Sequence, residues 1–390
     1  MSFYYLPDLS AGSFRATALV SALTQQLPDL AQLDVVTTLP NRYSTFSVDD
    51  ALEFERRPSL EIRRIRLPGH NSGMWDQSRA FLHFAKEARR HVQTRRYDLV
   101  YATSSRLMTA ALGAWIAKRQ KAKLYLDIRD IFVDTIMSVL PRRLAIVTRP
   151  FFSVIERWTI EQADRVNLVS GGFRSYFEIR YPSREYSFFS NGVDEEFIEA
   201  HARVNTREPA RNPLTVLYAG NIGEGQGLHV IIPALAKRMQ GRAVFKLIGD
   251  GGRKRALEAA LQRAGVDNVE LLPPVKREQL IDAYRGADVL FLHLNDYEAF
   301  KKVLPSKLFE YAAMGKPIWA GVSGYAADFV RSEISNAAVF NPCDADGAEE
   351  AFSRLSFVET PRAGFIEKFS RARLMRAMAA DLLSLTRSHA

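Results

Sequence analysis

Residues 297–320 read YEAFKKVLPSKLFEYAAMGKPIWA and carry the signals of a loop, a helix and a strand in two dozen positions. Pro305 and Ser306 stand where a helix begins, because proline tolerates the first helical turn and serine can accept bonds from free backbone N–H groups. Gly315 ends that helix, and apolar residues follow as a buried strand. A helix start beside a strand end favours an anion, so this stretch predicts a phosphate site.

Glu310 lies one turn into the predicted helix, on the face that also carries Lys307 and Met314. A carboxylate at this position can accept hydrogen bonds from two ribose hydroxyls at once. An amphipathic helix with solvated Glu and Lys side chains has the same local pattern. Motifs elsewhere in the second half of the chain distinguish the ribose-binding interpretation from the solvated helix.

Two glycine-rich turns decide in favour of a binding site. Residues 220–227, GNIGEGQG, and residues 249–252, GDGG, each follow a predicted strand and precede a predicted helix. Such turns let backbone amides approach a phosphate. Neither matches a P-loop, and the first lacks the later acidic residue of a dinucleotide site. Together with the helix carrying Glu310, they predict one ligand crevice.

Strand and helix patterns alternate twice along the chain, which predicts an α/β fold with two doubly wound, Rossmann-like domains facing each other across a cleft. The boundaries are predicted at residues 1–195 and 196–364, with residues 365–390 in one C-terminal helix that packs across both domains. The predicted strands are 2–6, 33–38, 60–67, 97–103, 123–128, 165–170 and 186–190, then 214–219, 244–248, 269–272, 289–294 and 318–320.

Polar residues also gather at predicted strand ends in the first half. Gly12 follows the first strand, and Arg15 lies in the first turn of the next helix, predicted to start near residue 13, from which it can reach the crevice. Asp127, Arg129 and Asp130 close a later strand. Two carboxylates and a guanidinium can orient an acceptor hydroxyl, although an Asp–Arg pair serves equally well as a structural tie.

The composition is that of a globular protein, with 47% hydrophobic and 25% charged residues and a single cysteine. One cysteine excludes a disulfide framework and favours a reducing compartment. We find no signal peptide and no apolar run long enough to span a bilayer, so we expect a cytoplasmic protein. No Asp-x-Asp or histidine cluster is present, and neither a metal nor another cofactor is expected. His293, at a strand end, is either a site residue or a buried polar residue.

The net charge of +9 is concentrated in the first half. Residues 1–190 hold 27 Lys and Arg against 19 Asp and Glu, and residues 191–390 hold 26 against 25. A basic half can face nucleic acid or anionic lipid, but no nucleic-acid-binding motif is present. Residues 141–158, PRRLAIVTRPFFSVIERW, suit a segment lying in a membrane interface. A core helix with a solvated basic face explains most of the same pattern.

Six motifs together resemble a known family. The sequence is similar to retaining glycosyltransferases of the GT-B class, family 4, above all to the bacterial subgroup that assembles O-antigen and capsule repeat units and includes N-acetyl-fucosaminyl transferases. The resemblance covers nearly the whole chain. Its motifs are PDLSAGSFR (7–15), DIRD (127–130), SNGVD (190–194), YAGNIGEGQGL (218–228), IGDG (248–251) and LPSKLFEYAAMGKP (304–317).

The resemblance implies a role for each of these motifs. Glu310 would bind the ribose of a nucleotide-sugar, the backbone at 304–306 its diphosphate, and the loop around Val275 its base. Gly12 would border the diphosphate and the acceptor, and the Arg129–Asp130 pair would lie near the reacting sugar. The implied donor site comprises Gly12, Gly220, Asn221, Gln226, Gly249, Asp250, Val275, Leu304, Pro305, Ser306, Lys307 and Glu310; the predicted acceptor residues are Arg15 and Asp127; the predicted catalytic residues are Arg129, Asp130 and Lys302.

The chain departs from the broad family pattern at three positions. The first glutamate of the usual Glu-x7-Glu pair falls on Lys302, and the two usual basic residues fall on Asn221 and Gln226. The charge of the phosphates is then left to cations elsewhere, for which the candidates are Lys301, Lys302, Lys307 and Arg253.

The implied activity is transfer of an N-acetylated hexosamine or deoxyhexosamine, with retained configuration, from a nucleotide diphosphate, predicted to be UDP. The implied acceptor is a saccharide on undecaprenyl diphosphate. The basic first half predicts that the enzyme works peripherally, on the inner face of the cytoplasmic membrane. Two other functions remain open: a nucleotide-sugar 2-epimerase and a non-catalytic binding subunit of a polysaccharide assembly complex.

Overall fold

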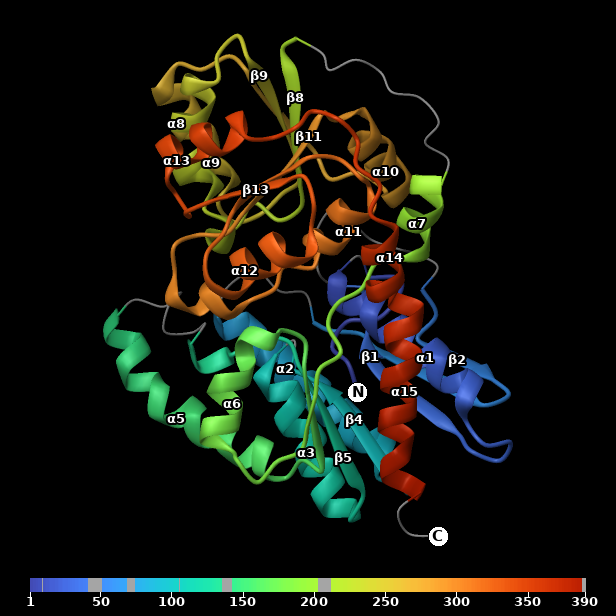
Figure 1. Cartoon of the computed structure of the whole chain (residues 1–390). Helices are drawn as coiled ribbons and strands as arrows, with labels where there is room; N and C mark the ends of the chain where they lie inside the picture. The colour runs from blue at the N-terminus through green and yellow to red at the C-terminus, as the bar shows by residue number, and fades with distance from the viewer. Residues whose placement is uncertain are drawn as a thin grey trace. The chain divides into compact units, whose positions relative to one another are not determined.

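The computed structural model describes residues 1–8, 10–40, 51–68, 74–104, 106–134, 142–202 and 212–387. The chain divides into two compact units (Figure 1). Unit 1 comprises Met1–Asn191 with Arg371–Ala390, and unit 2 comprises Gly192–Ser370. Each unit has parallel strands flanked by helices, so the predicted α/β fold of two Rossmann-like domains is confirmed. No helix in the described ranges is long and apolar enough to cross a bilayer.

Unit 2 is built on a six-stranded parallel sheet in the order β10-β9-β8-β11-β12-β13. Its first strand lies in the middle, and the chain adds β9 and β10 on one side and the later strands on the other. Ligands of open α/β sheets bind at the carboxyl ends of the strands where this direction reverses, here between β8 and β11. The strands are β8 Leu214–Ala219, β9 Ala243–Ile248, β10 Val269–Leu272, β11 Val289–His293, β12 Ile318–Gly321 and β13 Ala337–Phe340.

Helices cover both faces of this sheet. Trp319 is fully buried on one face, where its ring lies 4.8 Å from that of Phe352, and its indole N–H donates to the carbonyl of Ala348. Phe309 is fully buried on the other face against Phe369. The first face carries α8 Leu228–Arg238, α9 Lys254–Ala264 and α13 Ala345–Ser353; the second carries α7 Glu195–Ala202, α10 Arg277–Gly286, α11 Lys307–Ala313, α12 Gly324–Glu333 and α14 Ala363–Phe369.

Unit 1 contains a parallel sheet β4-β5-β6-β7 and a sheet β1-β3-β2, in which only β2 is antiparallel. Residues 2–6 were predicted as a strand, but they form no regular ladder. The Ser2 N–H donates to Val36 of β1, and the Met1 carbonyl accepts from Thr103 of β4, so this segment lies between the two sheets. The strands are β1 Leu33–Thr38, β2 Phe54–Arg57, β3 Leu60–Ile65, β4 Leu99–Thr103, β5 Lys123–Ile128, β6 Arg165–Leu168 and β7 Tyr186–Ser187.

The helices of unit 1 lie on both sides of β4 and β5. Leu19 of α1 and Met378 of α15 form one core cluster with Tyr125 of β5. Gly113 of α3 faces Ala102 of β4 on the opposite side, where any side chain would collide with that alanine. The helices are α1 Ala11–Gln26, α2 Met74–Val92, α3 Leu107–Gln120, α5 Arg142–Glu161, α6 Arg174–Arg180 and α15 Arg371–Arg387.

The predicted single C-terminal helix is two helices, α14 in unit 2 and α15 in unit 1. The Phe369 carbonyl accepts from the N–H of Val193 at 2.8 Å, and Ser370 is not helical, with φ −53° and ψ 124°. In a continuous helix the Phe369 carbonyl would accept from the N–H of residue 373. Here it accepts from Val193 instead, and the helix ends at Phe369. The prediction also missed β2, whose residues are largely exposed, and β13, a run of only four residues.

Candidate functional site

The two glycine turns of unit 2 pack against each other at the carboxyl ends of β8 and β9. Gly220 and Gly249 have φ of +141° and +152°, and a side chain on Gly249 would overlap the carbonyl oxygen of Gly220. The Gly220 N–H donates to Ile248 at 2.8 Å, and the Ile222 N–H donates to Asp250 at the same distance. Glycine is therefore required at both positions; Gly249 is buried, and the half-buried Gly220 lies at the end of β8, beside the switch point of the sheet.

Asn221 and Gln226 hold the first turn together. The Asn221 amide donates to Oε1 of Gln226 at 2.9 Å, and the Gly223 N–H donates to the same oxygen at 3.3 Å. The two positions where the resemblance leads one to expect cations therefore hold neutral amides bonded to each other. They shape the turn and bring no positive charge to it.

His293 is a structural residue of the same region. The Cys343 N–H donates to Nε2 at 2.9 Å, so Nδ1 carries the ring proton and donates it to the Gln226 carbonyl at 2.7 Å. Burial lowers the pKa of His293 to about 4. Of the two interpretations of His293, the buried polar residue is the one observed.

Lys307 brings a positive charge to the end of β8. Its side chain lies across Gly220, so that a Cβ there would overlap Lys307 Cε and Nζ. The ammonium is 5.4 Å from the ring centroid of Tyr218, whose hydroxyl donates to the Asn221 carbonyl at 2.6 Å. An amine from α11 thus reaches the turn at the switch point.

Glu310 is half-buried one turn further along α11. Its Oε2 accepts from the hydroxyl of Tyr284 at 3.2 Å. Burial and then the charge of Glu310 raise the pKa of Tyr284 far above its ordinary value, so this hydroxyl remains a donor. The bond orients the carboxylate from the side of α10.

Arg277, at the first position of α10, adds positive charge near Glu310. Burial opposes that charge, but Asp194 and then Glu310 outweigh it and raise the pKa of Arg277. Arg277 pairs with Asp194 and lies 4.7 Å over the ring of Phe197. Neither Arg277 nor Tyr284 was predicted as a site residue, because no local sequence pattern shows that α10 packs beside α11.

Two of the four candidate phosphate cations are engaged with glutamates. Arg253 pairs with Glu224, and a hydrogen bond from Tyr297, followed by Arg253, lowers the pKa of Glu224. Lys301 pairs with Glu298. Lys302 is half-buried at the end of the short helix η3 Glu298–Lys302, and Lys307 lies at Gly220.

The remaining predicted donor residues flank α11 or face its core. Leu304 is buried, and Val275 packs against the same apolar cluster. Pro305 and Ser306 are half-buried, and Asp250 accepts the N–H of Gly251 at 2.8 Å. The predicted cap by the Ser306 side chain is wrong: Ser306 has helical dihedral angles and makes no capping bond. A helical residue there directs its hydroxyl away from the free N–H groups.

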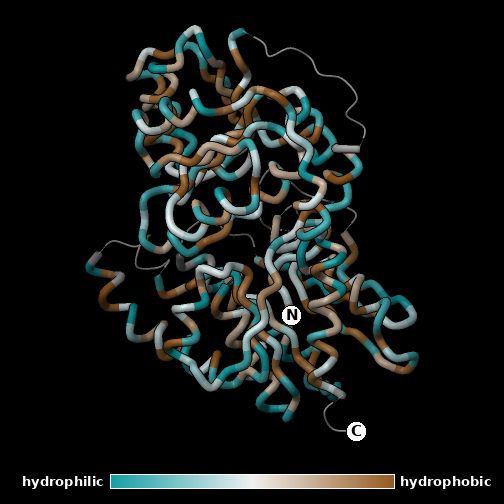
Figure 2. Tube along the Cα trace, in the orientation of Figure 1, coloured by the Kyte–Doolittle hydropathy of each residue, from teal (hydrophilic) through white to brown (hydrophobic). Residues whose placement is uncertain are grey.

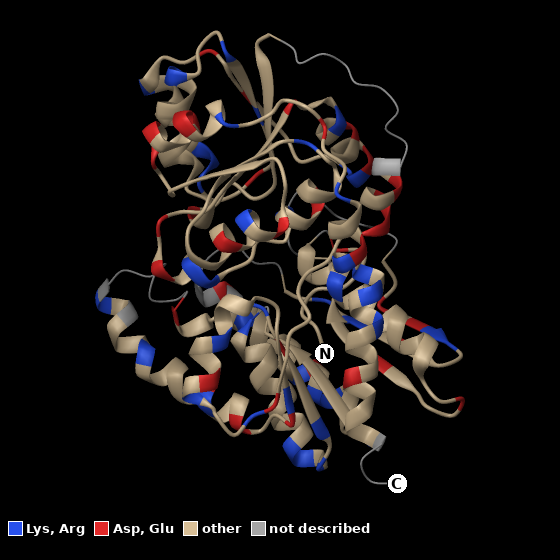
Figure 3. Ribbon diagram, in the orientation of Figure 1, with Lys and Arg blue, Asp and Glu red and all other residues tan. Residues whose placement is uncertain are grey.

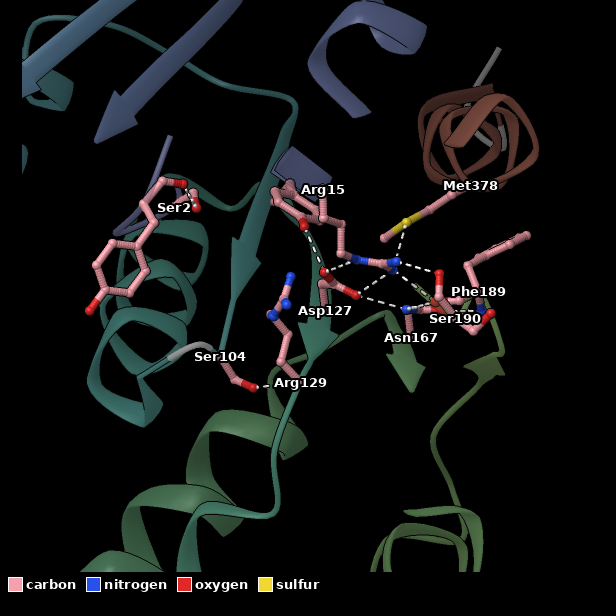
Figure 4. Close-up of polar contacts among 11 residues, drawn as sticks. Ser2, Arg15, Ser104, Asp127, Arg129, Asn167, Phe189, Ser190 and Met378 are labelled. Atoms are coloured by element: carbon pink, nitrogen blue, oxygen red, sulfur yellow. Dashed lines mark hydrogen bonds and ion pairs between the residues drawn. The ribbon is translucent and has the colours of Figure 1, made fainter. Parts of the chain in front are cut away.

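In unit 1, Arg15 and Asp127 form a fully buried ion pair (Figure 4). Two guanidinium nitrogens donate to the two carboxylate oxygens at 2.9 and 3.0 Å, and Arg15 also donates to the carbonyls of Phe189 and Ser190. Tyr101 donates to the same carboxylate at 2.9 Å. Burial alone would raise the pKa of Asp127, but Arg15 outweighs it and the pKa is lowered.

These contacts correct the predicted acceptor role of Arg15 and Asp127. Neither side chain has exposed surface, and the Sδ of Met378 from α15 lies 3.3 Å from Arg15. A group without exposed surface has no room for an acceptor. The pair ties α1, β5 and the segment after β7 together, which is the structural role that the sequence left open.

Gly12 and Arg129 lie close together beside this ion pair. Helix α1 begins at Ala11, where the Ser10 hydroxyl caps the Ser13 N–H, so Gly12 belongs to the first helical turn and not to a preceding turn. A Cβ on Gly12 would be 3.9 Å from the Arg129 guanidinium carbon. Burial and then the charge of Arg15 lower the pKa of Arg129. Asp130 is exposed and lines a small pocket with Ser104, Phe132 and Glu156.

The described residues hold no group of three His, Cys, Asp or Glu side chains able to bind a metal.

Comparison with known families accounts for both units. Residues 16–192 match the glycosyl transferase 4-like domain, and residues 203–368 match the glycosyl transferases group 1 family. The two matches cover separate halves of the chain. The glycine turns, Lys307 and Glu310 all lie within the residues matched to the group 1 family. Asp127 lies within the 4-like match, and Arg15 lies one residue before its start.

Two curated relatives match part of the chain. The glycosyl transferase WcaI of Escherichia coli K12, assigned by its name to colanic acid biosynthesis, is 27% identical over 212 residues, 51% of each chain. The D-inositol 3-phosphate glycosyltransferase of Xylanimonas cellulosilytica is 33% identical over 189 residues, 46% of this chain and 43% of its own. The chain thus spans about half the length of the curated relatives that it matches.

Solved structures share the fold of the two domains. Sucrose-phosphate synthase from Thermosynechococcus elongatus superposes with a TM-score of 0.68 at 18% identity, covering 96% of this chain and 92% of its own. WaaG, a glycosyltransferase involved in lipopolysaccharide biosynthesis, has a TM-score of 0.58 at 13% identity over 99% and 96%. Anabaena HepE in complex with UDP has 0.52 at 16% over 84% of each chain. At these identities the likeness establishes the GT-B fold alone.

Proposed function

We propose that this protein is a retaining glycosyltransferase that moves a sugar from UDP to a lipid-linked saccharide during surface polysaccharide biosynthesis. The two glycosyltransferase domains support the reaction class. The name of WcaI supports the polysaccharide context, and HepE in complex with UDP supports the nucleotide. The transferred sugar, an N-acetylated hexosamine or deoxyhexosamine, is proposed on the family resemblance.

One observation carries the proposal: Lys307 and Glu310 lie one turn apart on α11 beside the β8–β11 switch point. Glu310, oriented by Tyr284, would accept the ribose hydroxyls. Lys307 would neutralise the diphosphate, which would approach the half-buried turn at Gly220. The loop at Val275 would hold the base, and the backbone of 304–306 would bind the diphosphate from the other side.

The reaction breaks the bond between the sugar carbon and the diphosphate oxygen and forms a bond from that carbon to an acceptor hydroxyl oxygen. The departing diphosphate takes the proton of that hydroxyl, so no protein nucleophile is assigned. Lys307 and Lys302 would stabilise the charge that develops on the diphosphate. Arg129 and Asp130 are assigned to the reacting sugar. Neither a metal nor another cofactor is assigned a role.

The acceptor is proposed to be a saccharide on undecaprenyl diphosphate, which would place the reaction at the cytoplasmic face of the membrane. The basic balance of the first half supports an anionic surface as the partner, because each Lys or Arg close to such a membrane is attracted by about 1 kcal/mol. A nucleic acid is not proposed as a partner.

The test starts from donor binding. The thermal midpoint is measured with UDP-, GDP- and dTDP-sugars, since a ligand at 100 times its Kd adds about 2.7 kcal/mol. We expect stabilisation by UDP-sugars. Products are then analysed with and without a membrane extract that supplies lipid-linked acceptors. Release of UDP only with the extract supports the transferase; a 2-epimer from donor alone identifies an epimerase; binding without any turnover identifies a binding subunit.

A further inference from the structure

Helix α5 of unit 1 presents an apolar stripe to solvent. Val147, Phe151 and Val154 are 75%, 62% and 67% exposed, and Leu144 is 39% exposed. Their spacing of three, four and three residues places all four within about 80° of the helix circumference at 100° per residue. The half-buried Trp158 continues the line. We call Leu144, Val147, Phe151 and Val154 the α5 stripe.

The C-terminal half of α5 is packed on its other side, which holds Phe151 and Val154 outward, whereas Ile146 in the N-terminal half is also 57% exposed. The ring of Phe152 lies 5.2 Å from that of Phe132. Buried Glu156 accepts hydrogen bonds from Tyr176 at 2.9 Å and Tyr181 at 3.2 Å. This arrangement corrects the interpretation of residues 141–158 as a core helix with a solvated basic face, because five large apolar residues of α5 are exposed.

Positively charged side chains flank the stripe. Arg143 and Arg157 are exposed beside it, and Arg149 is exposed on the far side of the helix. The sequence from Arg142 to Ile155 contains no Asp or Glu. Figure 2 shows hydrophobic and hydrophilic positions alternating along α5, and Figure 3 shows blue without red along its first half. The side chain of Arg142 lies outside the described residues.

We propose that α5 lies in the interface of an anionic lipid bilayer, with the stripe among the acyl chains and the flanking Arg143 and Arg157 at the lipid phosphates. Helices with one apolar face and a cationic flank bind membranes in this way. A second copy of the chain is a poorer partner. Two copies of a cationic helix repel each other, and the stripe exposes roughly 400 Å², about half of what each partner in a stable complex buries.

The inferred membrane-binding surface rests on the proposed function, because an enzyme that uses a lipid-linked acceptor meets that acceptor at a membrane. Its physical basis is separate, because the stripe lies in unit 1 and the nucleotide residues lie in unit 2. Membrane binding and nucleotide binding can therefore be measured independently.

The experiment is flotation of the full chain with phosphatidylcholine vesicles that contain either no phosphatidylglycerol or 30% of it. We expect binding only to the anionic vesicles, and less of it in 0.5 M salt. Phe151→Ser should weaken binding about tenfold, since an aromatic side chain would then no longer enter the acyl region. Arg143→Ala should weaken it roughly fivefold, because Arg143 lies about 20° from the edge of the stripe at 100° per residue.

Leu82→Ser is the matched control, because Leu82 is 69% exposed on a different helix of the same unit. It should leave flotation unchanged. UDP binding by calorimetry and the thermal midpoint should be the same in all variants. Equal loss in Leu82→Ser and Phe151→Ser would overturn the proposal, as would a wild-type chain that ignores anionic vesicles at low salt. Light scattering that shows the stripe variants losing a dimer, with unchanged flotation, would overturn it too.

The two proposals fail separately in this design. UDP binding without flotation removes the docking surface and leaves the transferase intact. Flotation that depends on Phe151, in a chain that binds no nucleotide, supports the docking surface and overturns the donor site.

Discussion

The Arg15–Asp127 pair of unit 1 and the Lys307–Glu310 region of unit 2 both lie near the carboxyl ends of parallel strands, but only the second is open. In unit 1, α15 covers the strand ends, and Met378 reaches the guanidinium. In unit 2, Gly220 and both charged residues are half-buried and so keep some exposed surface. Charge at a strand end is therefore an ambiguous signal. Whether another element covers it decides between a structural tie and a binding site.

The largest effect should come from breaking the covered pair. Asp127→Ala leaves Arg15 charged and unpaired in the core, which should lower the free energy of unfolding by about 3–5 kcal/mol. Urea unfolding followed by circular dichroism measures it. The matched control is Glu178→Ala, which breaks the exposed pair with Arg174 and should cost less than about 1 kcal/mol. Normal stability of Asp127→Ala with failed acceptor use would restore the acceptor role that the burial of Asp127 argues against.

The next effect concerns His293, a covered residue inside the open region. Its pKa is about 4 in the folded protein, below the ordinary 6.5. Between these values the unfolded chain binds more protons, so stability is full above pH 6.5 and falls as the pH drops through 4. The loss is about 3 kcal/mol at about 1.36 kcal/mol per pKa unit.

The measurement is urea stability from pH 7.5 to 4 for the wild type and for His293→Gln, whose curve should be flatter by that amount. His83→Gln, at an exposed position on α2, is the control and should follow the wild type. Identical curves for all three proteins would mean that the imidazole is not held neutral.

The sequence predicts the fold better than the site, because strands have local patterns whereas the contacts that shape a site do not. Alternating apolar runs identified β1, β5, β8 and β10 at their observed bounds, because buried parallel strands are continuous apolar segments. Local patterns also identified Gly220, Gly249 and Glu310 as candidates. They could not show the bond between Asn221 and Gln226, the contact of Tyr284 with Glu310, or the cover that α15 gives to Arg15. The first of these contacts depends on how the turn folds back on itself, and the other two join residues far apart in the chain.

The open region is tested by Glu310→Ala. Loss of a charged hydrogen-bond acceptor costs about 1.5–3 kcal/mol, so UDP binding should fall roughly ten- to a hundredfold. The fold should remain intact, because Glu310 is half-buried and its partner Tyr284 is held by the core. Calorimetry with UDP measures the effect, and Glu298→Ala is the control. Unchanged UDP affinity in folded Glu310→Ala protein would remove Glu310 from the site.

The smallest effect separates two lysines within the open region. Lys307 lies across Gly220 at the switch point, whereas Lys302 is at the end of η3 and is a candidate phosphate ligand only by its position in the sequence. If Lys307 meets the diphosphate, Lys307→Ala should weaken UDP several-fold and leave uridine, which has no phosphate, unchanged, since an exposed charge pair contributes about 1 kcal/mol or less. The loss should shrink in high salt, because exposed charges are screened. Lys302→Ala tests whether η3 adds a second cation: a similar loss for UDP alone would give the diphosphate two lysines. Equal losses for UDP and uridine in Lys307→Ala would mean that the amine supports the turn at Gly220 and does not touch phosphate, and the open region would then rest on Glu310 alone.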